Sequence, residues 1–258
     1  MNAIFDTHSH YDDEQFDNDR DALLSSLPAK GVVNAVSCGV DIATSKANQA
    51  LAHQYGYLYF AAGFHPENLE GFDLSDLAAI ESLAADEKCV AIGEIGLDYH
   101  WMASPKETQQ AFFREQALLA NRLGLPVIVH DREAHGDTLA LLQETKPQGV
   151  LHCFSGSKEM AREIIKLGMY IGLNGVVTFK NARKSLEVVQ EIPLERLVLE
   201  TDCPYLCPVP YRGRRNDSSY IPYVAERIGE VLGLEAQAVL DITAANARRL
   251  YQLDESVL

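Results

Sequence analysis

The sequence predicts an α/β protein built as one (β/α)8 barrel, and three observations support this. Eight short apolar runs recur along the chain, each followed by enough residues for a helix. Several runs are rich in Val and Ile and apolar on both faces, as expected for parallel strands that are covered on both sides. No Pro-, Gly- or Ser-rich linker, low-complexity tract or internal repeat divides the chain, so we expect residues 1–258 to form a single domain.

The predicted strands span residues 3–8, 32–40, 57–64, 89–95, 126–130, 150–154, 169–173 and 197–200. Helix signals lie between them. Ser104 and Pro105 supply an N-cap and a first helical residue, and Gly124 ends that segment. A further helix over 157–167 ends before Gly168. An open, doubly wound sheet is the alternative architecture, but no Gly-rich phosphate loop follows the first strand to support it.

The chain is acidic, with a formal net charge of −15 over 258 residues. This charge argues against broad electrostatic adhesion to nucleic acid or to an anionic membrane. If the substrate is a polyanion, bound cations and a local basic patch must attract it. The length and the 47% hydrophobic content suffice for a substantial core.

The five cysteines are an odd number, spread along the chain without a C-x-x-C pair. This pattern favours reduced thiols in the cytoplasm over a disulfide framework. The first residues lack a basic region followed by an apolar run, and no apolar stretch approaches the length of a membrane span. We therefore expect a cytoplasmic protein without a membrane partner, and no obligate protein partner is evident.

Polar side chains crowd the predicted strand ends, where (β/α)8 barrels carry their chemistry. Because strand side chains alternate between faces, His8 and His10 project from the same face and can both ligate one metal ion. Other strands end in similar groups. The candidate metal ligands are His8, His10, Glu94, His130, His152 and Asp202. Nitrogen and carboxylate donors without thiolate suit ions such as Mg, Mn or Zn.

Six ligands exceed what one metal needs, which favours two divalent ions per subunit. Glu94 is the expected bridging ligand, with His8, His10 and Asp202 on one ion and His130 and His152 on the other. Such a pair lowers the pKa of a bound water and stabilises the attacking and leaving oxygens of a displacement. We expect Glu94 and Asp202 to be catalytic, with Asp202 orienting or deprotonating the water.

Three residues are candidates for substrate binding: His65, Arg132 and Arg215. Arg215 belongs to the densest basic segment, 212–217, whose guanidinium groups can pair with phosphate; the alternative is a solvated loop that balances nearby acids. Arg132 follows His130 by two residues, although an ion pair with Asp131 is equally consistent with the sequence. The aromatic residues after Glu94 either stack on a base or cap the barrel.

Several motifs resemble the ordered signatures of the TatD family of metal-dependent hydrolases. They are Asp6-Thr7-His8-Ser9-His10, Gly63-Phe64-His65-Pro66, Gly93-Glu94-Ile95-Gly96-Leu97-Asp98-Tyr99, His152-Cys153-Phe154-Ser155-Gly156, Glu200-Thr201-Asp202-Cys203-Pro204-Tyr205-Leu206 and Asn246-Ala247-Arg248-Arg249-Leu250. The resemblance runs from residue 4 to about 251. It implies a TIM barrel of the amidohydrolase-like type, divalent metals and, for studied members, Mg-dependent deoxyribonuclease activity. The family's ligand pattern falls on the six residues named above.

Departures from the family pattern are local. The usual Arg-Asn-Glu-Pro is Arg215-Asn216-Asp217-Ser218 here, and Glu133 stands where Asp is common. They put the shape of the substrate-facing loop in doubt.

The leading hypothesis is a hydrolase that cleaves DNA phosphodiester bonds with a metal-activated hydroxide. Because some members of the family are associated with removing D-amino acids from tRNA, hydrolysis of an ester, an amide or aminoacyl-tRNA is the alternative. A metal-stabilised binding protein without catalysis is a third hypothesis.

Overall fold

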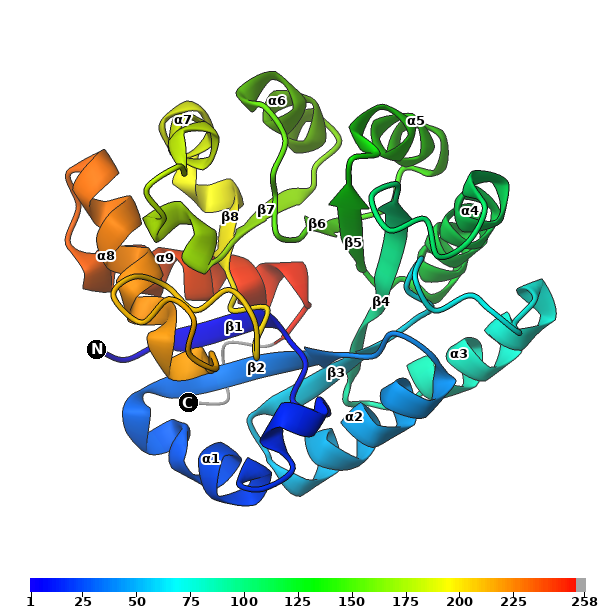
Figure 1. Ribbon diagram of the computed structural model, residues 1–258, viewed down its shortest axis with the longest axis horizontal. Helices are drawn as coiled ribbons and strands as arrows, with labels where there is room; N and C mark the ends of the chain where they lie inside the picture. The colour runs from blue at the N-terminus through cyan, green and yellow to red at the C-terminus, as the bar shows by residue number, and fades with distance from the viewer. Residues whose placement is uncertain (254–258) are drawn as a thin grey trace.

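The computed structural model describes residues 1–253, and in it eight parallel strands form a nearly closed barrel (Figure 1). Neighbours in the sheet are consecutive in the chain, which confirms the predicted fold class and excludes a doubly wound order. The strands are β1 (Ile4–Ser9), β2 (Val32–Cys38), β3 (Leu58–Ala62), β4 (Cys89–Asp98), β5 (Val127–Arg132), β6 (Gly149–Leu151), β7 (Tyr170–Leu173) and β8 (Leu197–Leu199).

The barrel closes where the first strand meets the segment after the eighth. The backbone N–H of Asp202 donates to the carbonyl of His8 over 3.0 Å, and the N–H of His10 donates to the carbonyl of Cys203 over 2.8 Å. A single bridge also pairs Ser9 with Cys203. This closure brings two ends of the chain together, so residues about 195 positions apart share one site.

Helices surround the barrel, one after each strand (Figure 1). They are α1 (Arg20–Ser26), α2 (Ile42–Gln54), α3 (Leu77–Ala84), α4 (Lys106–Leu123), α5 (His135–Thr145), α6 (Lys158–Lys166), α7 (Arg183–Glu191) and α8 (Ile221–Leu232), followed by α9 (Ala236–Leu250). Across residues 1–253, no helix is both long enough and apolar enough to cross a membrane.

Helix α4 begins one residue later than the sequence predicted. Pro105 is the N-cap, with the extended angles φ −56° and ψ 147°, and Ser104 makes no capping hydrogen bond. The carbonyl of Ser104 instead accepts from the buried Gln109 amide over 2.9 Å. The ends of α4 and α6 otherwise agree with the prediction: Gly124 adopts φ +68° after α4, and the Ser157 side chain accepts from the N–H of Met160 at the start of α6.

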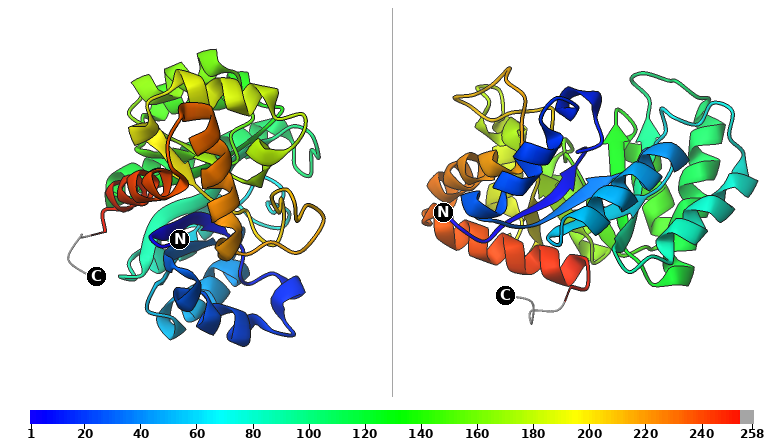
Figure 2. Two further views of the ribbon diagram at one scale, coloured as in Figure 1. Left: turned by 90° about the vertical axis from the view of Figure 1, so that its left-hand side faces the viewer. Right: turned by 90° about the horizontal axis from the view of Figure 1, so that it is seen from below.

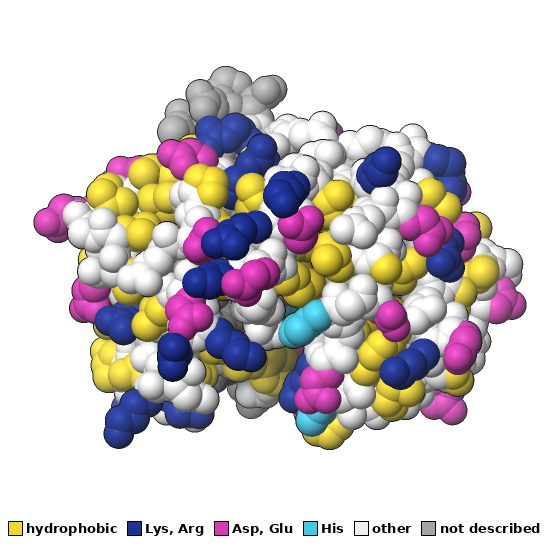
Figure 3. Space-filling view, turned by 90° about the horizontal axis from the view of Figure 1, so that it is seen from above, with side chains coloured by type: hydrophobic (Ala, Val, Ile, Leu, Met, Phe, Trp, Pro, Cys, Tyr) yellow, Lys and Arg dark blue, Asp and Glu magenta, His cyan; other side chains and the backbone are white. Residues whose placement is uncertain are grey.

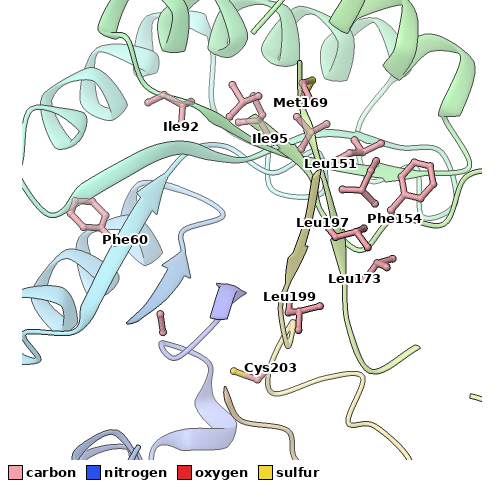
Figure 4. Close-up of a cluster of buried hydrophobic side chains, with 14 of the residues drawn as sticks. Phe60, Ile92, Ile95, Leu151, Phe154, Met169, Leu173, Leu197, Leu199 and Cys203 are labelled. Carbon is pink, nitrogen blue, oxygen red and sulfur yellow. The ribbon is translucent and has the colours of Figure 1, made fainter. Parts of the chain in front are cut away.

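The larger part of the core lies between the strands and the surrounding helices. Figure 4 shows part of it, with Phe60, Ile92, Ile95, Leu151 and Leu197 packed in one buried cluster. A second cluster fills the inside of the barrel. It joins Phe5, Val36, Ala61, Ala91, Ile128, Val150 and Val198 to side chains of α9. Both faces of each strand are therefore buried, which explains why the strands were recognisable as short apolar runs.

Helix α9 covers one end of the barrel. In the right-hand view of Figure 2 it runs along the lower edge, while the loop that follows β8 stands at the opposite edge. Tyr251, directly after α9, is buried and stacks on Phe5 with ring centroids 6.0 Å apart. Its hydroxyl donates to the carbonyl of Thr7 over 2.7 Å. The helix thus supports, from below, the strand that carries His8 and His10.

Candidate metal centre

The carboxyl ends of the strands bring all six predicted ligands into one place. His10, Glu94, His130, His152 and Asp202 line a cavity of about 1090 Å³, and His8 lies fully buried beneath it. In four groups of histidine, aspartate and glutamate side chains, the possible ligand atoms lie within 4.8 Å of one another. Two groups consist of predicted ligands alone, His8 with His10 and Glu94 and His8 with His152 and Asp202, and the other two are His65 with Glu94 and His130 and Glu67 with Asp98 and His130.

The two histidines of β1 point their Nε2 atoms at each other, 3.0 Å apart. The Nδ1 atom of His10 lies 3.1 Å from the carbonyl oxygen of Cys38. A carbonyl oxygen only accepts, so this Nδ1 carries the proton and Nε2 presents a lone pair. The strand alternation predicted from the sequence therefore aims the free nitrogen of His10 into the centre.

Glu94 lies between two groups of histidines, and each of its oxygens faces one group. Oε2 lies 3.3 Å from His8 Nε2 and 3.5 Å from His10 Nε2. Oε1 lies 2.8 Å from His152 Nε2 and 3.0 Å from His130 Nδ1. A carboxylate in this position has the geometry to bridge two cations.

Asp202 completes the group around β1. Its Oδ1 lies 3.5 Å from the Nε2 atoms of both His8 and His10. The residue adopts φ +57°, a left-handed conformation that Asp tolerates better than most residues. The buried Asp6 stabilises the turn, because its carboxylate accepts from the N–H and hydroxyl of Thr201 over 2.9 and 2.6 Å and from the Ser218 hydroxyl over 2.6 Å.

A second carboxylate orients His130. The Nε2 atom of His130 lies 3.1 Å from Oδ2 of Asp98, which is fully buried. An ionised carboxylate only accepts, so Nε2 donates and Nδ1 is left with a lone pair on the side of Glu94. Burial would raise the pKa of Asp98, but the hydrogen bond and charge of His130, together with the backbone N–H groups of Trp101 and His100, outweigh burial and lower that pKa, so the carboxylate is ionised at neutral pH.

The electrostatics of the cavity favour positive charge. Burial opposes protonation of His10 and His130, yet hydrogen bonds to Asp202 and Asp98 respectively, together with the charge of Glu94, raise the pKa of each histidine to about 9. Burial would likewise raise the pKa of Glu94, but the surrounding histidines hold it well below its usual range. Cations bound here would replace those protons.

Two buried polar atoms without partners also fit a metal site. His152 Nδ1 and Glu200 Oε2 form no hydrogen bond to any residue in the described part of the chain. They belong to side chains that nearly meet, with His152 Nδ1 3.7 Å from Oε1 of Glu200. A histidine that ligates through Nε2 usually presents its Nδ1–H to such a carboxylate. The sequence analysis gave Glu200 no role. Its position directly after β8, two residues before Asp202, nevertheless indicated that it lies near the metal centre.

His65, predicted to bind substrate, lies at the edge of the same group. Its Nε2 is 3.4 Å from Oε1 of Glu94, and its Nδ1 accepts from the backbone N–H of Glu67 over 3.2 Å. Burial lowers the pKa of His65, so the ring is neutral and its proton sits on Nε2. In this tautomer His65 donates a hydrogen bond into the centre and has no lone pair there for a metal.

Arg132, the second predicted substrate residue, lies at the cavity rim. Its guanidinium stacks on Trp101, with Cζ 5.5 Å from the ring centroid. Asp131 pairs with His135 over 2.7 Å, so an ion pair between Asp131 and Arg132 is not what the structure shows. Tyr99, by contrast, is tied to the helices by its hydroxyl, which donates to Asp137 over 2.7 Å.

Arg215, the third predicted substrate residue, does not line the cavity. Its guanidinium makes two hydrogen bonds to the carboxylate of Asp19, over 2.7 and 2.6 Å, and lies over the ring of Phe16. It fastens the loop after β8 to the segment before α1. Arg212 and Arg214 stack on Phe179 and Tyr211 respectively.

A barrel with histidine and carboxylate side chains gathered at the carboxyl ends of its strands is typical of metal-dependent hydrolases of the TIM-barrel type. Comparison with known families gives the more specific assignment. A family model described as TatD related DNase matches residues 5–252. The chain belongs to the TatD family.

Relatives align over nearly the whole chain. The metal-dependent hydrolase YabD of Bacillus subtilis, itself described as uncharacterized, is 44% identical over 97% of this chain and 100% of its own length. A protein of Cronobacter sakazakii named 3'-5' ssDNA/RNA exonuclease TatD is 36% identical over 96% of this chain and 97% of its own length.

Solved structures support the same family assignment. YJJV, a TatD homologue from Escherichia coli, superposes with a TM-score of 0.89 at 31% identity, covering 98% of this chain and 99% of its own. A mutant organophosphorus hydrolase from Deinococcus radiodurans shares the fold alone, with a TM-score of 0.59 at 17% identity over 97% of this chain and 95% of its own. The chain is a metal-dependent hydrolase.

Proposed function

We propose that this hydrolase cleaves phosphodiester bonds of single-stranded DNA at a site that holds two divalent cations, Mg, Mn or Zn. The observation that carries the proposal is Glu94, whose two oxygens face separate groups of histidines at 2.8 to 3.5 Å. His8, His10 and Asp202 would hold one ion, and His130 and His152 the other. The relatives named as single-strand exonucleases support the choice of bond and substrate.

The charge of the surface supports a local rather than a broad attraction for such a substrate. Figure 3 shows Lys and Arg side chains over α6 and α7, interspersed with Asp and Glu. Many of these cations are paired, for example Arg162 with Glu191 and Arg183 with Glu187. Bound cations and the rim residue Arg132 would therefore attract the phosphates, as the net charge of −15 requires.

Each residue has a defined part in the proposed reaction. Divalent cations, when bound, polarise the phosphoryl group and make a water more acidic. Hydrogen bonds and charge from the neighbouring histidines overcome the effect of burial and lower the pKa of Asp202, so its carboxylate is ionised and can accept the proton of the attacking water. His65 donates from Nε2 to a phosphoryl oxygen, and Arg132 pairs with a phosphate.

The test uses single-stranded oligonucleotides labelled at either end and incubated with purified protein and Mg, Mn or Zn. We expect a metal-dependent ladder that is absent with a chelator and with Glu94→Ala, because that change removes the bridging ligand. Glu195→Ala is the matched control: Glu195 is exposed and forms no ion pair within residues 1–253. The labelled end that survives gives the direction of cleavage.

Cleavage that persists in Glu94→Ala would refute the proposed centre. No cleavage by wild-type protein that retains bound metal would refute the phosphodiester assignment. In that case an ester, amide or aminoacyl-tRNA substrate becomes the next to assay.

A further inference from the structure

Trp101 is the single tryptophan of the chain, and it stands exposed at the rim of the cavity. About 60% of its surface is accessible, more than for any other large hydrophobic side chain in residues 1–253. An exposed indole at the rim of a cavity offers a flat apolar face on which a ligand can stack. Its position beside the metal centre restricts that ligand to something bound in the same cavity.

The backbone at Trp101 is held by the carboxylate that also orients a metal ligand. Oδ1 of Asp98 accepts from the backbone N–H groups of His100 and Trp101, each over 2.8 Å. Oδ2 of the same carboxylate lies 3.1 Å from His130 Nε2. The buried Asp98 thus fixes the backbone of Trp101 relative to the metal centre, so the point from which the indole projects is pre-organised although the ring is exposed.

Arg132 gives this part of the rim a cation that can bind a ligand. Its guanidinium lies over the indole, and within the described chain it forms no ion pair and no side-chain hydrogen bond. The ring of His100 makes an edge-to-face contact with Trp101, with ring centroids 4.7 Å apart and an interplanar angle of 86°. An aromatic face next to a free guanidinium matches a base next to a phosphate.

The opposite wall of the cavity would repel phosphates. It carries Asp12, Asp13 and Glu14 after β1, whereas the Glu67 carboxylate lies within 4.8 Å of Asp98 and His130. A hydrogen bond of 2.8 Å from the Tyr205 hydroxyl to Asp13 joins the β8 and β1 loops on that side. A polyanion in the cavity therefore lies toward the ends of β4 to β7, where Trp101, Arg132 and Ser155 form the rim.

We propose that Trp101 and Arg132 form a subsite for one nucleotide of a single strand, with the indole stacked on the base and the guanidinium paired with a phosphate. The proposal deepens the proposed function and rests on it. The substrate class follows from the exposure of the ring. An unpaired base can lie flat on Trp101, whereas a base inside a duplex has both faces covered.

The test measures kcat/KM on two strands of equal length and charge, a short oligothymidylate and a strand in which each nucleotide lacks its base. We expect Trp101→Ala to lower kcat/KM on oligothymidylate about tenfold to hundredfold, the range for loss of one stacked base. On the abasic strand the variant and the wild type should agree within about twofold, because no base is there to stack. Trp101→Phe should recover most of the loss.

Because Trp101 is the single tryptophan, its emission reports directly on the subsite. Rapid mixing with oligothymidylate should quench the emission of the wild-type holoenzyme, and the abasic strand should not. Met102→Ala is the matched control: Met102 is the adjacent exposed residue and is not among the cavity-lining residues. It should leave both kcat/KM and the quenching unchanged.

Each outcome separates the subsite from the reaction. If the wild type cleaves oligothymidylate and Trp101→Ala keeps kcat/KM within twofold, the subsite is overturned and the proposed function is left intact. If wild-type protein cleaves neither strand, the proposed function fails, and quenching by oligothymidylate alone would then still support the subsite. Equal quenching by both strands, or none by either, would overturn it.

Discussion

Glu200→Gln tests whether a buried carboxylate outside the ligand set controls metal affinity. Glu200 is fully buried at the end of β8, and its Oε1 accepts from the backbone N–H of Cys153 over 2.6 Å. Glutamine keeps the length of the side chain and this accepting oxygen. Its amide nitrogen takes the place of Oε2, which has no hydrogen-bond partner within residues 1–253. The substitution therefore removes the charge and leaves most of the contacts.

The expected loss follows from the distance to His152. Oε1 of Glu200 lies 3.7 Å from Nδ1 of the ring, and two unit charges at that separation interact by about 4.5 kcal/mol at an effective dielectric constant of about 20. A ring that ligates a cation carries only part of a charge, so we expect about half, roughly 2 kcal/mol. This corresponds to an approximately 30-fold weaker Kd, within the range of about 10- to 100-fold for such partners of metal ligands.

The assay is competition for Zn²⁺ against a chromogenic chelator, with circular dichroism to show that the variant is folded. Glu195→Gln is the control, because it removes the same charge from an exposed position. Folded Glu200→Gln protein whose Kd stays within threefold of the wild type would refute the reasoning. The charge of Glu200 would then have no role in holding the ion.

Four further predictions follow from the geometry. His65→Ala should lower kcat/KM about 100-fold without loss of bound metal, because it removes a donor rather than a ligand, and His65→Gln should restore part of the rate; metal loss, measured by atomic absorption, would make His65 a ligand. Arg215→Ala should lower the free energy of unfolding by at most about 1 kcal/mol and keep kcat/KM within twofold; a tenfold fall in kcat/KM would place Arg215 at the substrate. Gly96→Ala should lower the free energy of unfolding in urea by about 3 kcal/mol or more, because Gly96 has φ +141° and a Cβ there would lie 2.0 Å from the His130 carbonyl oxygen. Gly56→Ala is the control, since no atom lies within 4 Å of a Cβ at that position. Equal losses of stability in the two variants would contradict the argument. Chelation should lower Tm, because ions that bind only the folded state stabilise it by about 2.7 kcal/mol at 100 times Kd, and an unchanged Tm would show that the ions add nothing to stability.

The strands could be predicted because both of their faces are buried. Each of the eight apolar runs corresponds to an observed strand, although β6 and β8 are only three residues long. The candidate ligands could be found for a related reason: a polar side chain at the end of a buried strand has few places to point except into the mouth of the barrel. The start of α4 lies one residue after the predicted one, and the hydrogen bond from the buried Gln109 amide to the Ser104 carbonyl is a contact that spacing alone does not reveal.

The roles of Arg215, His65 and Glu200 could not be predicted, because they depend on three-dimensional contacts that the sequence pattern does not show. The basic composition of the segment around Arg215 suggested phosphate binding, but its partner Asp19 lies 196 positions away. The tautomer of His65 depends on the backbone N–H of Glu67, which a sequence motif does not encode. Glu200 and Asp202 are two residues apart and both carry a carboxyl group, yet only the turn between them shows that Asp202 faces the cavity while Glu200 lies behind His152.

The barrel has one usable opening. Apolar side chains fill its interior, and α9 with Tyr251 covers the end away from the ligands. On the proposed function, a strand could not be threaded through such a barrel, so the shortened strand and the released nucleotide would leave by the mouth through which the substrate arrived. Product and substrate would then compete for the same passage, and each released nucleotide would have to clear the mouth before the strand could advance.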